Sequence, residues 1–140
     1  MYSMDDSGFP LLLVRWTGTS SKEDFAAFFE ELERLHQRAR TSNARLVTIH
    51  DARTAQRPDA PAREFAATRM KQATLDGSLL DVVVTDQAAL RGVITAMSWV
   101  LPGQMKKVKS TATLQEAYAL ANQIYVDAKL PLPQRPRWAS

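Results

Sequence analysis

Short apolar runs alternate with longer amphipathic stretches along this 140-residue chain. Three runs are typical of buried strands: Phe9–Trp16, Arg45–His50 and Leu79–Thr85, the last with three consecutive valines. Each run is followed by a stretch whose apolar residues recur at helical spacing. Successive strands joined by helices pair most simply in parallel, because each crossing helix then covers the sheet. The pattern therefore predicts an α/β domain.

Four helices are expected between and after these strands. Capping residues mark where each begins, because a Ser, Thr or Asp side chain can accept a hydrogen bond from the first free amides of a helix. The first helix is predicted over Lys22–Ala39, with Ser20 and Glu23 at the spacing of a capping box; the others are predicted to start at Asp59, at Thr85 or Asp86, and at Thr113.

Two further strands complete the predicted sheet. Met105–Lys109 is expected at an edge, where lysines discourage pairing with another chain. Tyr2–Met4 is expected to pair back on Phe9–Trp16 across a turn. The prediction is a four- to five-stranded, mostly parallel sheet in a single domain of residues 1–126. A proline-rich tail, residues 127–140, follows it.

The composition excludes several kinds of site. The chain has no cysteine and two histidines, which excludes disulfides and thiolate metal sites and makes a metal centre or cofactor unexpected. No apolar run reaches the ~18 residues of a membrane-spanning helix, so we expect a cytoplasmic protein without membrane insertion. A net charge of +3 does not indicate nucleic-acid binding, and the basic stretch Lys106–Lys109 has no interleaved aromatic residue.

The expected carboxyl ends of the strands carry polar residues. In an open α/β sheet, ligands bind beyond these ends. A small molecule could therefore occupy a crevice lined by Thr17, His50, Asp51 and Asp86. A catalytic His50–Asp51 pair is disfavoured, because adjacent residues of a strand point to opposite faces. No Gly-x-Ser-x-Gly motif is present, so we expect a protein that is not an enzyme.

Two other features indicate possible interaction surfaces. Arg53, Arg57 and Arg63 flank the start of the second helix and could hold an anion or an acidic partner, or form a solvated loop. The third helix is apolar on nearly every side, which predicts a homodimer through a face containing Met97, Val100 and Leu101. The alternative is that the tail folds back over this helix through Leu130, Leu132 and Trp138.

Three segments carry a family resemblance. They are the strand RLVTIHDA, the helix start Asp59-Ala60-Pro61, and the stretch VVVTDQAALRGVITAMSW, followed by a TLQEAYALA-type final helix. Over about Phe9–Tyr125 the chain resembles the STAS domains, the anti-sigma-factor-antagonist fold, and especially their SpoIIAA-like branch. The resemblance implies a regulatory domain of bacterial signalling that binds a protein partner, such as a regulatory kinase or an anti-sigma-like protein.

The resemblance also implies a switch that this chain lacks. Regulatory members carry a phosphorylated serine in an Asp-Ser-Ser-Gly segment at the start of the second helix. The matching segment here is Asp59-Ala60-Pro61-Ala62, which has no hydroxyl group. We therefore expect an adaptor without phosphoregulation at this position. The partner-binding residues expected are Asp51, Arg53, Arg57, Asp59, Ala60 and Arg63. The small-molecule crevice is the alternative.

Overall fold

The sheet has five strands in the order β1-β2-β3-β4-β5. The structure, a computed structural model, describes residues 1–72, 78–91 and 106–137. β1 (Tyr2–Asp5) pairs antiparallel with β2 (Leu11–Thr19), and β3 (Leu46–Gln56), β4 (Ser78–Val84) and β5 (Val108–Thr111) follow in parallel. This confirms the predicted α/β class, the mostly parallel sheet and the pairing of the first strand with the second.

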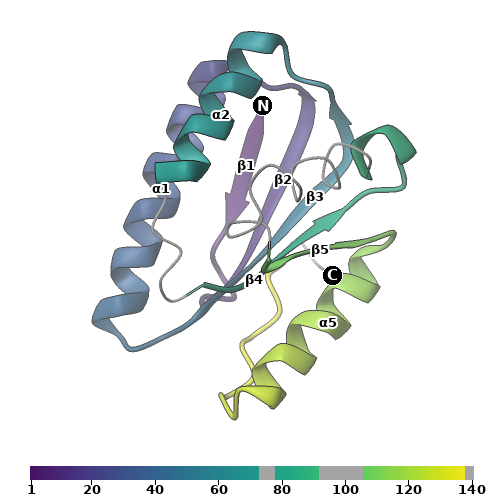
Figure 1. The fold of residues 1–140 in the computed structure, drawn as a ribbon. Helices are drawn as coiled ribbons and strands as arrows, with labels where there is room; N and C mark the ends of the chain where they lie inside the picture. Colours follow the sequence, from purple (N-terminus) through teal and green to yellow (C-terminus); the bar gives the residue numbers. More distant parts are fainter. Residues whose placement is uncertain (73–77, 92–105, 138–140) are drawn as a thin grey trace.

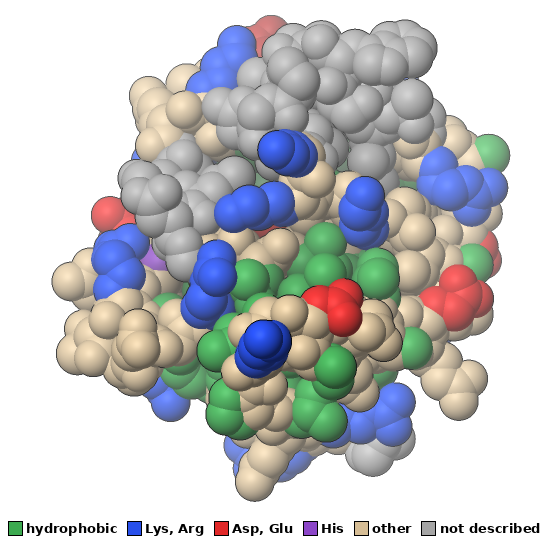
Figure 2. Space-filling view, turned by 60° about the horizontal axis from the view of Figure 1, so that its bottom comes forward, with side chains coloured by type: hydrophobic (Ala, Val, Ile, Leu, Met, Phe, Trp, Pro, Cys, Tyr) green, Lys and Arg blue, Asp and Glu red, His purple; other side chains and the backbone are tan. Residues whose placement is uncertain are grey.

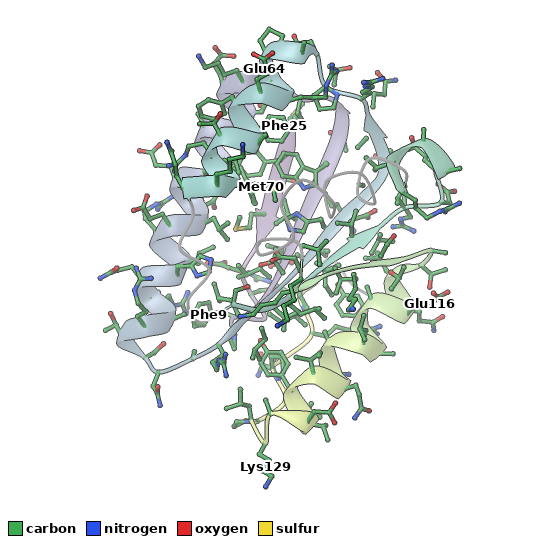
Figure 3. The ribbon with its side chains drawn as sticks, viewed as in Figure 1. Phe9, Phe25, Glu64, Met70, Glu116 and Lys129 are labelled. Carbon is green, nitrogen blue, oxygen red and sulfur yellow. The ribbon has the colours of Figure 1, made fainter. Side chains whose placement is uncertain are left out.

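Helices cover both faces of the sheet (Figure 1). α1 (Lys22–Thr41) and α2 (Ala60–Gln72) lie on one face, and α5 (Leu114–Asp127) lies on the other. In Figure 3, the label Glu116 lies at the first turn of α5 and the label Lys129 just beyond its last residue. The third expected helix starts within residues 88–91. The remainder, including Met97, Val100 and Leu101, lies outside the described residues, as does Trp138. In the described ranges, no helix is long and apolar enough to cross a membrane.

Alternate residues of the central strands form two separate cores. Toward α5, Leu11 and Leu13 of β2 pack with Val47 and Ile49 of β3 and with Tyr125 of α5. Toward α1, Leu12 and Leu46 pack with Leu35 and Ala39. Because successive side chains of a strand point to opposite faces, each polar residue within β3 is committed to one core or the other.

The first helix is capped one residue later than predicted. Ser21 accepts a hydrogen bond from the Asp24 amide at 3.1 Å, and the Asp24 carboxylate accepts one from the Ser21 amide at 2.9 Å. The sequence offers two overlapping capping boxes, Ser20 with Glu23 and Ser21 with Asp24. The second is used, and Ser20, just after β2, is buried and accepts a hydrogen bond from the N-terminal nitrogen of Met1 at 3.0 Å instead.

Two strand boundaries differ from the prediction. β3 continues to Gln56, although the sequence predicted a loop from Asp51 to Pro58. The extra residues pair with the equally extended end of β2, where Thr17 lies opposite Thr54. The last strand is Val108–Thr111 rather than Met105–Lys109, because its hydrogen-bonding groups align with β4 from Asp81 onward. Tertiary pairing set both boundaries.

The described part of the tail lies against the β1–β2 turn. Arg137 donates its amide hydrogen to the Ser7 hydroxyl at 3.0 Å, and Pro136 is buried. Gly8 makes this approach possible, because a Cβ there would stand 3.0 Å from the Pro136 nitrogen and closer still to the Gln134 carbonyl oxygen. Both obstacles are backbone atoms, which cannot rotate away. Leu130 meanwhile packs against the α5 core.

Replacing Gly8→Ala should therefore displace the tail. We expect a loss of about 1–3 kcal/mol in the free energy of unfolding, as for other overpacked sites, and faster proteolytic cleavage between Lys129 and Arg137. Gly18→Ala is the matched control: Gly18 has a φ of 60° but open space around its Cβ position. It should cost stability through backbone strain and leave the tail protected. Equal tail cleavage in both variants would contradict the proposed contact.

Candidate functional site

An ion pair organises the far end of β3. The Arg53 guanidinium binds Asp51 through both oxygens, Nε to Oδ1 and Nη2 to Oδ2, each at 2.9 Å. The Arg53 amide also donates to Oδ1 at 3.3 Å. From the neighbouring strand, Arg15 Nε lies 3.9 Å from Asp51 Oδ2. A register shift between β2 and β3 falls at this point, and such a bulge re-aims the side chains beside it.

The electrostatics of Asp51 favour its charged form. Its side chain is only 9% exposed. Burial alone would raise the pKa of Asp51, but the hydrogen bonds from Arg53 and the charges of Arg53 and Arg15 outweigh burial and lower that pKa. The same hydrogen bonds raise the pKa of Arg53. Asp51 is therefore a buried support that orients an exposed arginine.

The start of α2 is stabilised by its own side chains. Asp59 Oδ1 accepts a hydrogen bond from the Ala62 amide at 3.0 Å, as the sequence predicted for a cap. Arg63 Nη1 donates to the Pro58 carbonyl oxygen at 2.6 Å. Arg57, Asp59 and Ala60 are exposed. The first helical amides thus already face a carboxylate of this chain.

Neighbouring polar groups at the strand ends are also engaged within the molecule. Gln87 Nε2 donates to the carbonyl oxygens of Arg53 and Ala55 at 3.2 and 3.1 Å. Thr19 donates to Gln56 Oε1 at 3.1 Å. Thr17 and Asp86, expected to line a crevice, are exposed. At this edge, the structure shows side chains that bind one another across the strand ends.

The structure places His50 and Asp51 on opposite faces of the sheet. His50 Nδ1 accepts from Trp16 Nε1, and His50 Nε2 contacts Asp81 Oδ1, both at 3.2 Å. Since an indole nitrogen can only donate, Nε2 carries the imidazole hydrogen and donates it to Asp81. A general base needs a nitrogen lone pair directed at its substrate. In His50 that lone pair is occupied by Trp16.

This network was missed by the sequence reasoning, although one signal for it exists. Asp81 is the only charged residue within the apolar run Leu79–Thr85, and a charge in a half-buried strand requires a partner. Which residue would supply that partner depends on the register of β3 against β4. Aromatic side chains then enclose Trp16: its ring centre lies 4.9 Å from that of Phe28 and 5.3 Å from that of Phe25.

The second histidine, His36, belongs to α1, the helix that covers the same face of the sheet as His50. His36 of α1 is 8% exposed, and its Nδ1 has no hydrogen-bond partner among the described residues. Burial lowers the pKa of His36; Asp81 opposes this shift and Arg40 reinforces it. Within the described ranges, no three His, Asp or Glu side chains gather as a metal ion would require.

The comparisons with known proteins bear on the fold. No family model matches the chain, and no curated protein matches it. A solved structure does: an uncharacterised protein of the DUF3478 family from Shewanella loihica PV-4, described as having a SpoIIAA-like fold. The TM-score is 0.61 at 13% identity, over 86% of this chain and 91% of that one. This chain has a SpoIIAA-like fold.

The fold agrees with the resemblance drawn from the sequence. In this SpoIIAA-like chain, Asp59-Ala60-Pro61-Ala62 does stand at the start of the second helix, with Asp59 as its cap. Of the six expected partner-binding residues, Arg53, Arg57, Asp59 and Ala60 are exposed, Arg63 is half-buried, and Asp51 is buried beneath Arg53. Of the four expected crevice residues, His50 and Asp51 point to opposite faces of the sheet, and Thr17 and Asp86 are exposed.

Breaking the Asp51 contacts tests their importance. Asp51→Asn should lower the free energy of unfolding by about 2 kcal/mol, less than for a fully buried pair because the Arg53 side chain is 43% exposed. Asp6→Asn is the control, since the Asp6 side chain is 57% exposed and its ion pair with Arg38 is long, at 3.7 Å. This substitution should change the free energy of unfolding by no more than about 0.5 kcal/mol. Urea unfolding near neutral pH measures both. Equal losses would contradict a supporting role for Asp51.

His36 should make stability depend on pH. Because its folded-state pKa is lower than its ordinary value of 6.5, the unfolded chain binds more protons between those two values. Its contribution to stability is therefore complete above about pH 6.5 and decreases as the pH falls through that window. Urea unfolding between about pH 8 and pH 5 should show a smaller decrease for His36→Gln than for the native chain. Parallel decreases would exclude this role.

Proposed function

We propose that this chain is a non-enzymatic adaptor that acts by binding another protein. The binding surface lies where β3 ends and α2 begins, and comprises Arg53, Arg57, Asp59, Ala60 and Arg63, with Asp51 supporting Arg53 from below. The SpoIIAA-like fold supports a regulatory role in bacterial signalling, in the cytoplasm, because this is the role implied by the resemblance to STAS domains.

One observation carries the proposal: this surface is exposed, charged and already ordered. Arg53 is fixed by Asp51, and Arg63 by the Pro58 carbonyl oxygen. Asp59 is fixed by the Ala62 amide. Side chains held in place before binding lose less conformational entropy when a partner arrives. The arrangement therefore favours recognition of a complementary protein surface.

The same contacts weigh against the two other functions considered. A small-molecule site requires polar groups that converge on a hollow. Here Gln87 and Gln56 bind other groups of the strand ends instead. An enzyme built on His50 would need the lone pair that accepts from Trp16. These points support binding of a protein over binding or conversion of a small molecule.

Charge at the α2 start also suggests how the adaptor is regulated. The Asp59 carboxylate sits permanently at the helix amides, where a negative charge is favoured by the helix dipole. The segment has no hydroxyl to accept a phosphate. Binding of a partner through this surface would then not be switched by phosphorylation at that position.

A second region of the molecule exposes apolar groups. Val126 and Leu132 are 55% and 58% exposed. Figure 2 shows hydrophobic side chains at the centre of the face drawn there, with Lys and Arg and some Asp and Glu side chains around them. Exposed apolar patches are common on proteins that bind other proteins. The homodimer through the third helix stays a prediction, since its residues lie outside the described ones.

Reversing one exposed charge tests the partner surface. Arg57→Glu should abolish a partner that co-purifies with the native chain from its host lysate, while the fold is unchanged because Arg57 is exposed. Native mass spectrometry reports the partner and any retained small molecule together. Arg45→Glu, at the opposite end of β3, is the matched control and should keep the partner.

Two outcomes would contradict the proposal. Loss of the partner in both variants would point to a general charge effect rather than to this surface. A reproducible small added mass, without a protein partner, would favour the small-molecule alternative.

A further inference from the structure

One end of the molecule exposes apolar and basic side chains together. Val126, in the last turn of α5, is 55% exposed, and Leu132, in the tail that follows, is 58% exposed. Lys129 lies between them in the chain and is also exposed. Its label stands at the lower end of Figure 3, the end that Figure 2 brings forward. The apolar centre drawn in Figure 2 therefore belongs to a face that also carries basic groups.

Contacts between strands bring further basic residues to this end. The Tyr125 hydroxyl donates to the Arg45 carbonyl oxygen at 2.8 Å, which places the start of β3 at the end of α5. Lys107 Nζ donates to the carbonyl oxygen of Ser78, the first residue of β4, at 3.0 Å. Lys106 precedes Lys107 and is exposed. Three segments distant in sequence thus contribute cations to the end where the parallel strands begin.

The chain itself does not hold these cations in place. Arg45, Lys106 and Lys129 are exposed, and their side chains form no hydrogen bond or ion pair with any described residue. Asp127, the acidic residue at the end of α5, accepts a hydrogen bond from Gln123 Nε2 at 2.8 Å. Long basic side chains can lay their methylene groups along apolar surface and extend the charge outward. Such side chains suit an anionic surface whose own charges are mobile.

We propose that this end of the molecule docks on the surface of a membrane that contains anionic lipid. The aliphatic side chains of Val126 and Leu132 enter the boundary between headgroups and acyl chains. Arg45, Lys106 and Lys129 are attracted to the negative headgroups around them. The chain lies on the bilayer and does not cross it, in agreement with the lack of a spanning helix in the described ranges.

The chemistry of this face disfavours other occupants. A symmetric dimer through it would place the same cations on both sides of one interface, where like charges repel. Single-stranded nucleic acid is usually bound by aromatic side chains interleaved with basic ones. The large apolar side chains most exposed here, Val126 and Leu132, are aliphatic. An aliphatic centre with unfixed cations beside it matches a lipid surface best.

Membrane docking would leave the proposed partner surface accessible. β3 runs from Leu46 to Gln56 and spans about 35 Å, with Arg45 before its first residue and Arg57 after its last. The two surfaces therefore lie at opposite ends of one strand. A docked chain can present its partner surface away from the membrane. This consequence rests on the proposed function, whereas the docking itself does not.

Vesicle sedimentation tests the docking. The native chain is incubated with vesicles of equal parts phosphatidylcholine and phosphatidylserine, and with vesicles of phosphatidylcholine alone. We expect the chain to sediment with the anionic vesicles and to remain in solution with the neutral ones. Raising the NaCl concentration from about 0.1 M to about 1 M should release most of the bound chain, because the screening length falls from about 10 Å to about 3 Å.

Substitutions separate the charged contribution from the apolar one. Lys129→Ala should raise the dissociation constant for anionic vesicles about fivefold, the usual effect of one basic residue near such a surface. Arg45→Glu should raise it further, because it reverses a charge. Leu132→Ser should raise it about tenfold, because it removes an aliphatic anchor. Arg57→Glu is the matched control: it changes the net charge as Arg45→Glu does and should bind like the native chain.

Several results would overturn the proposal. Equal binding to anionic and neutral vesicles, or to neither, would exclude recognition of anionic lipid. Binding by Leu132→Ser as tight as that of the native chain would exclude the apolar contact. Binding to polyglutamate or duplex DNA, without binding to anionic vesicles, would assign the cations to an acidic protein or a nucleic acid. A dimer in solution that Leu132→Ser dissociates would assign the face to a second copy.

The two charge reversals also keep this test apart from the partner test. Arg45→Glu should lose the vesicles and keep the protein partner, and Arg57→Glu should do the opposite. Equal loss of vesicle binding in both variants would show attraction by net charge rather than by this end of the molecule. Because each variant is measured against both ligands, either proposal can fail while the other stands.

Discussion

Backbone hydrogen bonds tie β3 to a parallel neighbour on each side, β2 and β4, and helices cover both faces of the sheet that these strands form. Every second side chain of β3 must therefore enter one core and the others the opposite core. For the apolar residues of β3, burial in either core is favourable. For His50 and Asp51, adjacent in sequence, it means that each needs a partner on its own face, and the rest of the polar architecture follows from how those partners are supplied.

The two faces solve this problem differently. On the α1 side, His50 is held between an indole and a carboxylate within a layer of aromatic rings, and it is left without a lone pair for catalysis. On the α5 side, Asp51 is held by arginines and keeps its charge. The contacts of His50 stabilise the fold, whereas the contacts of Asp51 position Arg53 at the surface. This asymmetry is why the proposed interaction surface lies on the arginine side of the strand end.

The α5 face also connects parts of the chain that are distant in sequence. Tyr125 donates to the Arg45 carbonyl oxygen at 2.8 Å and fixes the end of α5 at the start of β3. The tail then passes to the β1–β2 turn, where Gly8 admits its backbone. On this path the Arg135 guanidinium lies over the Tyr118 ring, 4.6 Å from its centre. A glycine near the N-terminus thus leaves the space in which the tail backbone near the C-terminus lies.

The sequence by itself determined the order of the elements, the parallel pairing and the caps at Asp59 and Thr113, because these depend on local spacing and on residues near in the chain. Only the tertiary structure decided how far β3 extends, since residues Asp51–Gln56 are strand only where the end of β2 pairs with them. It also decided the partners of Asp81 and His50, because contacts across strands depend on register and bulges, which local sequence does not encode. Sequence alone therefore named Asp51 and Arg53 as residues of interest, but only the structure shows that Asp51 is buried and holds Arg53 in place.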